Sequence, residues 1–398
     1  MAFFNSMEEW KEYKISEVID EISMGPFGSN IKVDNFINFG VPVLNGSNLQ
    51  GFKLNEDSFN YVSQEKADSL GKANAHKGDV IITHRGTLGQ IVYIPEESKY
   101  EQYVISQSQF RLQLKQELIR PDFFVYFFHT RLGQHRILMN ASQVGVPALA
   151  RPTSTFKEVL VPVPPMKVQV KILSILKSLD DKIELNRKIN ANLEAQAQAL
   201  FKSWFVDFEP FKDQPFVESE LGMIPEGWRV GTLGELIDIK YGKDHKKLLE
   251  GCYPVYGSGG FMRCAEKAIY SGESVLIPRK GTLNNVMYVN EAFWTVDTMF
   301  YSIPKVEKVI LFVYIFLCNR DLSSLNAGSA VPSMTTEILN NMKIIIPIQK
   351  ILNVFNDIAS TLYSSIKQQQ QESRCLASLR DTLLPRLMSG ELKVNEVI

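Results

Sequence analysis

The sequence lacks the features that mark a membrane-spanning or exported protein. Its 398 residues contain no apolar run near the roughly eighteen residues of a membrane span, and MAFFNSMEEW has no basic leader followed by an apolar core. The four cysteines show no CxxC spacing, so neither a zinc knuckle nor a redox pair is predicted. Free thiols fit a reducing compartment, so we expect a cytoplasmic protein that binds no membrane.

The sequence also lacks a charge excess and the motifs of common catalytic sites. Lys and Arg number 43 against 44 Asp and Glu, so any nucleic acid must be bound by local basic residues or with a partner's help. No phosphate-binding GxxxxGK[ST] loop, HExxH, GxSxG or Asn/Asp-Pro-Pro-aromatic tetrapeptide occurs. The five histidines are scattered and form no ligand pair at helical spacing. We therefore expect a chain that is not itself an enzyme and holds no metal.

Two long segments, 166–205 and 349–387, have the pattern of coiled-coil helices. In each, apolar residues recur alternately every four and three positions, with polar residues at the centre. In the first segment the heptad positions are Ile172, Leu176, Leu179, Ile183, Asn186, Asn190, Leu193, Ala197, Leu200 and Trp204. In the second they are Ile351, Phe355, Ile358, Leu362, Ser365, Gln369, Glu372, Leu376, Leu379 and Leu383. A helix of roughly forty residues spans about 60 Å, more than one compact domain needs, so we expect the two to pack together.

The two segments match each other, which indicates a tandem repeat. Aligning them places Leu179 on Leu362, Ile183 on Ile366, Leu193 on Leu376 and Leu200 on Leu383, with Pro164 on Pro347. Trp10 and Trp228 open the two halves. The repeating unit is therefore a globular head followed by a long helix, and the second head is the shorter one.

Within the heads, three further pairs of segments match in the same order. GVPVLNGSNLQG matches GCYPVYGSGGFM, HKGDVIITHRGTLGQIVYI matches YSGESVLIPRKGTLNNVMYV, and YVISQSQFRLQL matches FWTVDTMFYSI. Their short β-branched and aromatic runs, bounded by Gly, Asn, Ser or Pro, predict strands with tight turns. A helical patch follows in each head, and then a glycine- and proline-containing loop. Each head is predicted to be a mixed α/β unit.

This order of motifs resembles the specificity subunit of type I restriction–modification systems. The first half carries GDVIITHRGTLG, VGVPALARP and VPVPPMKVQVKI before a helix that ends LEAQAQALFKSWFVDF. The second half carries LIPRKGTLNNV, GSAVPSM, IIIPIQKI and SLRDTLLPRLMSGEL. The resemblance covers essentially the whole chain. It departs from the family at MKVQVKI, where the pair that usually precedes the helix keeps only Gln169.

The resemblance implies an α+β fold with an internal pseudo-two-fold repeat. Two mixed α/β target-recognition domains would be joined by two long antiparallel coiled-coil helices. The implied division is 1–163 for domain 1, 164–206 for the first spacer helix, 207–345 for the linker and domain 2, 346–388 for the second spacer helix, and 389–398 for a C-terminal tail.

The resemblance also implies a non-catalytic role in a DNA-methylating complex. Each head would read one half of an asymmetric, bipartite site in double-stranded DNA, and the helix pair would set the spacer between the halves. By the symmetry of the repeat, two adenine-methyltransferase subunits would dock on the chain, joined in some systems by motor and nuclease subunits. S-adenosylmethionine, ATP and magnesium are expected on those partners and not on this chain.

The turns that follow apolar strands are the best candidates for DNA contact. Arginine can bind guanine or phosphate in a bidentate way, glycine lets the backbone approach closely, and threonine can bind phosphate. The candidates in the first head are Arg85, Gly86, Thr87, Asn45, Ser47 and Asn48. Those in the second head are Arg279, Lys280, Gly281, Thr282, Tyr256, Ser258, Lys243, Lys246 and Lys247.

Other interpretations stay open for these residues and for the whole chain. A basic residue in a turn is often simply solvated, and Asn and Ser are common turn formers without any ligand. The whole chain could instead be a coiled-coil scaffold whose heads bind proteins. A DNA-reading protein would show binding that weakens with salt, whereas a scaffold would not.

Overall fold

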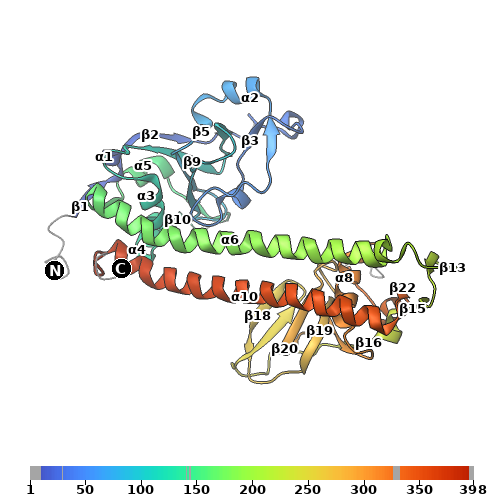
Figure 1. Ribbon diagram of the computed structural model, residues 1–398. Coiled ribbons are helices and arrows are strands. Elements are labelled where there is room, and N and C mark those ends of the chain that lie inside the picture. Colours follow the sequence, from blue (N-terminus) through green and yellow to red (C-terminus); the bar gives the residue numbers. More distant parts are fainter. Residues whose placement is uncertain (1–9, 29, 140, 143–144, 326–331, 394–398) are drawn as a thin grey trace. The chain divides into compact units, whose positions relative to one another are not determined.

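The computed structural model describes residues 10–28, 30–139, 141–142, 145–325 and 332–393 (Figure 1). The chain forms two compact units: unit 1 comprises residues 1–184 and 373–398, and unit 2 comprises 185–372. Two 40-residue helices, α6 (Met166–Phe205) and α10 (Gln349–Met388), each contribute to both units. Their bounds lie close to the predicted spacer helices 164–206 and 346–388. Below, head 1 is the part of unit 1 that precedes α6, and head 2 is the part of unit 2 between α6 and α10.

Head 1 is built on two four-stranded sheets. The antiparallel first sheet has the order β2-β9-β6-β7, with β2 (Ile19–Met24), β9 (Gln109–Leu114), β6 (Val80–Thr83) and β7 (Ile91–Tyr93). The second sheet has the order β4-β3-β8-β5, with β4 (Asn60–Val62), β3 (Val41–Val43), β8 (Gln102–Val104) and β5 (Asn74–His76). In this sheet β3 and β8 are parallel. The strands are short because Gly, Pro and Asn interrupt the β-branched runs.

A strongly apolar helix, α3 (Pro121–Phe128), closes the core of head 1. Seven of its eight residues are buried, and its phenylalanines share one apolar cluster with residues of the first sheet and of α6. Proline occupies its first turn, where the missing N–H costs no helical hydrogen bond. The other elements of head 1 are β1 (Lys11–Lys14), α1 (Ile15–Val18), η1 (Val33–Asn35), η2 (Gly46–Leu49), α2 (Gln64–Ser69), η3 (Gly71–Ala73), α4 (Arg131–Leu138), β10 (Ala141–Ser142), β11 (Ala148–Leu149), α5 (Pro152–Lys157) and β12 (Leu160–Val163).

Head 2 repeats this frame with fewer, longer strands. Its six-stranded sheet has the order β16-β21-β19-β20-β17-β18, with β16 (Ile237–Tyr241), β21 (Met299–Pro304), β19 (Tyr270–Pro278), β20 (Met287–Thr295), β17 (Tyr253–Gly257) and β18 (Gly260–Ala265). The nine-residue β19 takes the place of β5 and β6, and β20 takes the place of β7 and β8. As in head 1, one pair is parallel, between β17 and β20. Head 2 also runs directly from β18 to β19 without a helix, whereas head 1 forms helical elements at residues 64–73 before β5, and this contributes to the shorter length of the second head.

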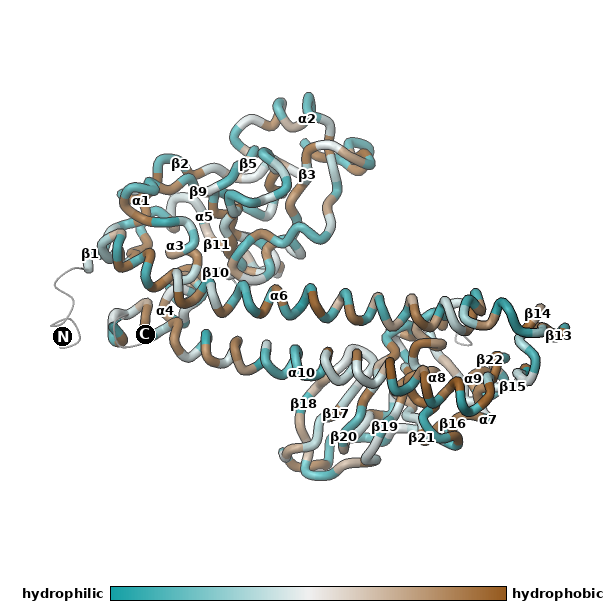
Figure 2. The backbone as a smooth tube through the Cα atoms, in the orientation of Figure 1, coloured by the Kyte–Doolittle hydropathy of each residue, from teal (hydrophilic) through white to brown (hydrophobic). Residues whose placement is uncertain are grey.

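An apolar helix and several short elements complete head 2. Helix α8 (Ile310–Cys318) corresponds to α3 and is mostly brown in Figure 2. The other elements are η4 (Glu209–Phe211), β13 (Phe216–Ser219), β14 (Gly222–Pro225), β15 (Arg229–Thr232), α7 (Leu233–Leu236), η5 (Leu322–Leu325), α9 (Thr336–Asn340) and β22 (Lys343–Ile346). Strand β15 pairs with β22 just before α10, as β1 pairs with β12 just before α6. The tandem repeat predicted from the sequence is therefore present in the fold.

Helices α6 and α10 run antiparallel within each unit. In unit 1, Asp180 of α6 pairs with Arg380 of α10; in unit 2, the Asn186 side chain donates to Glu372 over 2.8 Å. Phe201 and Phe355 meet farther along, with their ring centroids 6.1 Å apart. The predicted positions on α6 follow its buried stripe: Ile172 and Leu176 are buried, and Leu179, Ile183, Leu193 and Leu200 are half-buried.

On α10 the predicted register needs a correction. Its buried and half-buried stripe runs through Leu352, Phe355, Ala359, Leu362, Ile366, Gln369, Ser373, Leu376, Arg380, Leu383 and Leu387. Phe355, Leu362, Leu376 and Leu383 lie on this stripe, and Ile351 is half-buried beside Leu352. Ile358 and Leu379, however, are 41% and 48% exposed, and their neighbours Ala359 and Arg380 face inward. Apolarity alone favoured Ile358 and Leu379, but a small Ala359 and an ion-paired Arg380 take the inner positions.

Candidate nucleic-acid interface

In head 1 the Arg85-Gly86-Thr87 turn projects beyond the end of β6 and rests on the proline-containing loop. Arg85 forms a β-bridge with Ala148, the Gly86 N–H donates to the Pro147 carbonyl over 2.9 Å, and the Leu149 N–H donates to the His84 carbonyl over 2.9 Å. Gly86 has φ +91°, a conformation that favours glycine. All three residues of the turn are exposed, so the fold holds their backbone and leaves the side chains of Arg85 and Thr87 in solvent.

Head 2 builds the same turn on the same support. Lys280 bridges Ser333, the Gly281 N–H donates to the Pro332 carbonyl over 3.2 Å, and the Met334 N–H donates to the Arg279 carbonyl over 2.9 Å. Gly281 has φ +88°. Gly281 is thus the counterpart of Gly86, Lys280 of Arg85, and Arg279 of His84. Of the GSAVPSM loop that supports this turn, residues 328–331 lie outside the described part of the chain.

In each head the side chain two positions before the glycine makes contacts within the head, whereas the side chain directly before the glycine is exposed to solvent. Arg279 is half-buried; it donates to the Asp297 carbonyl over 3.2 Å and lies over the Tyr241 ring at 5.2 Å. His84 makes a 3.1 Å hydrogen bond from Nε2 to the Gln107 carbonyl, and burial lowers its pKa. A neutral His84 with the proton on Nε2 fits this contact, because a carbonyl only accepts. Among the turn residues, Arg85, Lys280, Thr87 and Thr282 are exposed.

The polar turn of head 1 at Asn45–Asn48 lies beside the Arg85 turn, but only part of it can reach a ligand. Gln90 joins them: it accepts from Thr83 Oγ1 and donates to the Gly46 carbonyl. Asn45 caps η2 by accepting from the Ser47 N–H and hydroxyl.

Asn48 corrects the sequence prediction. It is 2% exposed, its amide donates to two backbone carbonyls, and its Oδ1 accepts from the Asn45 N–H. Asn48 holds the turn and is too buried to contact DNA, whereas Ser47 is exposed. No sequence pattern indicated the bridging role of Gln90.

In head 2, Ser258 lies next to the Gly281 turn. A Cβ atom on Gly281 would come within 3.1 Å of Ser258 Oγ, and Asn285 donates to the Ser258 carbonyl over 2.8 Å. Tyr256 is half-buried and donates to Glu291 over 2.9 Å, so its hydroxyl is engaged within the head. Ser258 therefore belongs to the candidate surface, and Tyr256 supports it.

The basic loop of head 2 is held firmly while its lysines point to solvent. The Lys243 N–H donates to the Thr295 carbonyl, and Trp294 Nε1 donates to the Lys243 carbonyl over 2.9 Å. Arg263 donates to the carbonyls of His245 and Leu248, at 2.5 and 2.9 Å. The side chains of Lys243, Lys246 and Lys247 are exposed. The loop follows Tyr241, on which Arg279 stacks, so it adds positive charge beside the Gly281 turn. Sequence patterns did not indicate the supporting role of Arg263.

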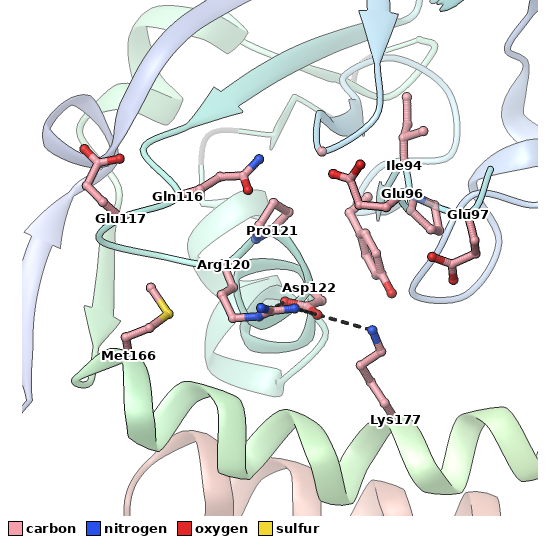
Figure 3. Close-up of a pocket in the computed structure, with 13 residues that line it drawn as sticks. Ile94, Glu96, Glu97, Gln116, Glu117, Arg120, Pro121, Asp122, Met166 and Lys177 are labelled. Atoms are coloured by element: carbon pink, nitrogen blue, oxygen red, sulfur yellow. Dashed lines mark hydrogen bonds and ion pairs between the residues drawn. The ribbon is translucent and has the colours of Figure 1, made fainter. Parts of the chain in front are cut away.

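Two cavities in unit 1 lie on the side of α6 and not at these turns. One, of about 380 Å³, has Arg120, Asp122 and Lys177 in its lining; Figure 3 shows Lys177 of α6 reaching Asp122 at the start of α3. The other, of about 650 Å³, is lined among others by Phe52, His129 and Arg380. In the described part of the chain, no three His, Cys, Asp or Glu side chains gather as metal ligands, and no helix is long and apolar enough to cross a membrane.

Comparison with known proteins gives the chain its family. Residues 7–195 and 225–374 match the type I restriction modification DNA specificity domain. The chain is 25% identical to the type I restriction enzyme MjaIX specificity subunit of Methanocaldococcus jannaschii, over 98% of this chain and 95% of that one. It is also 25% identical to the HindI specificity subunit of Haemophilus influenzae, over 97% and 100%.

A solved structure shares the fold. The S subunit of a type I restriction–modification system from M. genitalium superposes with a TM-score of 0.60 at 19% identity, covering 96% of this chain and 97% of that one. The paired turns, the repeated heads and the two matched domains lead to one conclusion: the chain belongs to the family of type I restriction–modification specificity subunits.

Proposed function

We propose that each head reads one half of an asymmetric, bipartite site in double-stranded DNA. The observation that carries this is the identical backbone frame at Gly86 and Gly281 beneath different exposed side chains. Head 1 presents Arg85 beside Ser47, and head 2 presents Lys280 beside Ser258 and the Lys243–Lys247 loop. A shared frame with different contacts is what two unlike half-sites require. The near-neutral chain fits a reader whose basic residues are gathered at these turns.

The same proposal assigns the helices and the partners. The chain is a non-catalytic specificity subunit, and α6 and α10 would set the spacer between the half-sites and dock two adenine-methyltransferase subunits. Exposed apolar side chains on the two helices, such as Leu185, Leu379 and Ile358, give such subunits a surface to cover. S-adenosylmethionine, ATP and magnesium would be bound by the partners, with a motor and nuclease subunit where the system has one. The complex would act in the cytoplasm.

A map of methylated adenines in the host genome, with and without this gene, tests the function. Loss of one bipartite methylated motif on deletion is the expected result. A map that does not change, together with a methyltransferase partner that still binds the chain, would favour a protein scaffold instead.

The salt dependence of DNA binding tests the turns. With the assembled complex, Arg85→Ala and Lys280→Ala should each lower affinity and reduce the slope of log affinity against log salt by about one. Lys11→Ala is the matched control: Lys11 is an exposed lysine on β1, outside the candidate turns, and its loss should leave the slope unchanged.

A further inference from the structure

Phe27 is an aromatic side chain that the fold holds in solvent. It is 82% exposed, although Pro26 before it is buried. The Gly25 N–H donates to the Gln109 carbonyl over 2.8 Å, and the Asn30 N–H donates to the Phe27 carbonyl over 2.8 Å to close a turn. A Cβ atom on Gly25 would lie 1.9 Å from the Ser106 carbonyl oxygen, so the segment packs backbone to backbone at this point. The backbone on both sides of Phe27 is thus anchored, while its ring is left in solvent.

The anchor of Phe27 is also the anchor of the Arg85 turn. The segment from Ser106 to Gln109 holds Gly25 on one side. On the other side it accepts from the His84 N–H at the Ser108 carbonyl, over 2.8 Å, and from the His84 ring at the Gln107 carbonyl. Since Arg85 follows His84 directly, Phe27 and Arg85 emerge from two turns that share one support.

Head 2 has a different loop at the same place. The Gly242 N–H donates to the Met299 carbonyl at the start of β21, as the Gly25 N–H does at the start of β9. After Gly25 the chain continues with proline and phenylalanine; after Gly242 it continues with the basic loop that contains Lys243, Lys246 and Lys247. One position in the repeated frame therefore carries an aromatic contact in head 1 and positive charge in head 2.

We propose that Phe27 contacts the bases of the half-site read by head 1, while Arg85 beside it contacts the phosphate backbone. The inference rests on the proposed function. A phenyl ring carries no charge to offer a phosphate, whereas base edges offer apolar features such as the thymine methyl group, and base steps accept apolar wedges. Phe27 is thereby a specificity-determining residue of head 1, and the loss of its ring affects one half-site only.

Replacing the chromosomal gene by variants and mapping methylated adenines tests this in the intact complex. Phe27→Ala should relax one half of the bipartite motif at one or two positions, with discrimination there falling about tenfold, and leave the other half unchanged. Phe39→Ala is the matched control. Phe39 is 81% exposed, but it lies just before β3, at the opposite end of that strand from the Asn45 turn. Close to it, the Ile37 N–H donates to the carbonyl of Tyr61 in β4. It should leave both halves intact.

The outcomes separate the two proposals. A wild-type host without any bipartite motif that depends on this gene would refute the proposed function and, with it, the role of Phe27. A bipartite motif that Phe27→Ala leaves unchanged in both halves would refute the role of Phe27 alone. If Phe27→Ala, Phe27→Leu and Phe27→Trp all abolish methylation at a normal protein level, Phe27 serves assembly and the base contact is wrong. Restored methylation with an altered half-site in the Leu or Trp variant supports the proposal.

Discussion

The Asp180 carboxylate on α6 and the Arg380 guanidinium on α10 form an ion pair, with 2.6 Å between Oδ1 and Nη1. Tyr126 of α3 donates its hydroxyl to the same carboxylate, and the guanidinium lies 4.9 Å from the centre of the Phe52 ring. In the alignment of the two repeats, Asp180 of α6 matches Tyr363 of α10. In unit 2, Tyr363 packs against Tyr314 of α8 with ring centroids 5.5 Å apart. The repeat therefore joins head to helices by a charged network in unit 1 and by aromatic packing in unit 2.

Removing Arg380 should weaken unit 1 selectively. The two paired side chains are only 18% and 21% exposed, so Arg380→Ala leaves the Asp180 charge poorly solvated. Partial solvent screening reduces the cost below that of a fully buried pair, and we expect the free energy of unfolding of unit 1 to fall by about 2 kcal/mol. Hydrogen exchange resolved by unit in the full chain measures this.

Asp381→Ala is the control for Arg380. Asp381 also binds Arg380, but its side chain is 63% exposed, so its loss should change exchange very little. Equal losses of protection in both variants, or a loss in unit 2 as large as in unit 1, would contradict the assignment of Arg380 to the junction.

Unit 1 should also lose stability in mild acid. Burial lowers the pKa of both His84 and His129 below the ordinary value of 6.5, so the folded unit keeps them neutral. As the pH falls through about 6.5 the unfolded chain binds protons that the folded chain does not, and the free energy of unfolding declines. The decline is at most about 1.4 kcal/mol per pH unit for each histidine, and it ends below the lowered pKa of the folded state.

The variants His84→Asn and His129→Gln, combined in one chain, provide the comparison. We would measure the exchange of unit 1 amides from about pH 7.5 to about pH 5.5, roughly one pH unit on either side of the ordinary histidine pKa, and correct it for the intrinsic effect of pH on exchange. The protection of these amides should depend less on pH in the double variant than in the wild type. An identical pH dependence in both proteins would show that these two rings do not account for the decline.

The two glycine turns should be sensitive to a single methyl group. Gly86 and Gly281 have φ of +91° and +88°, which an alanine adopts only with strain of about 1–2 kcal/mol. No atom would obstruct a Cβ at Gly86, whereas Ser258 would crowd one at Gly281. Either alanine should distort its turn, and methylation at the bipartite motif should fall while the fold persists.

Gly259→Ala is the matched control for the glycine turns. A Cβ atom at Gly259 would meet nothing within 4 Å, and this glycine is not among those with positive φ. Full methylation by Gly86→Ala or Gly281→Ala would mean that the turns do not position DNA contacts.

The fold could be predicted well from the sequence because each structural pattern occurs in both halves of the chain. Heptads, strand runs and Gly-Pro loops occur twice, so each half supports the interpretation of the other. What it could not predict is which of two adjacent residues faces inward, as Ile358 and Ala359 show, because both are compatible with a helix. Likewise Asn48 and Ser47 both suit a turn by composition. Only the carbonyls of Asn55 and Ser58, brought in by the fold, bury the first and leave the second exposed.

Gln169 is the residue whose importance the sequence concealed most. It is fully buried at the start of α6; its Oε1 accepts from the Arg120 N–H over 3.0 Å, and its Nε2 donates to the carbonyls of Leu118 and Pro164 over 2.8 and 2.9 Å. It thereby fastens the first turn of α6 to the backbone that leads into α3. Gln169→Leu would remove the side-chain partner of three backbone groups, of which the Pro164 carbonyl takes part in a buried hydrogen bond and the other two in part-buried ones, and unit 1 should lose about 1–3 kcal/mol of unfolding free energy.

Gln196→Leu makes the same substitution on the exposed side of α6 and should cost almost nothing. Unfolding of the full chain in urea, with exchange used to separate the units, compares the two variants. If Gln169→Leu proved as stable as Gln196→Leu, water or a shifted backbone would have to satisfy the three groups. The start of α6 would then be held by its apolar contacts at Ile172 and Leu176, and the amide would serve only to choose the direction in which the helix leaves the head.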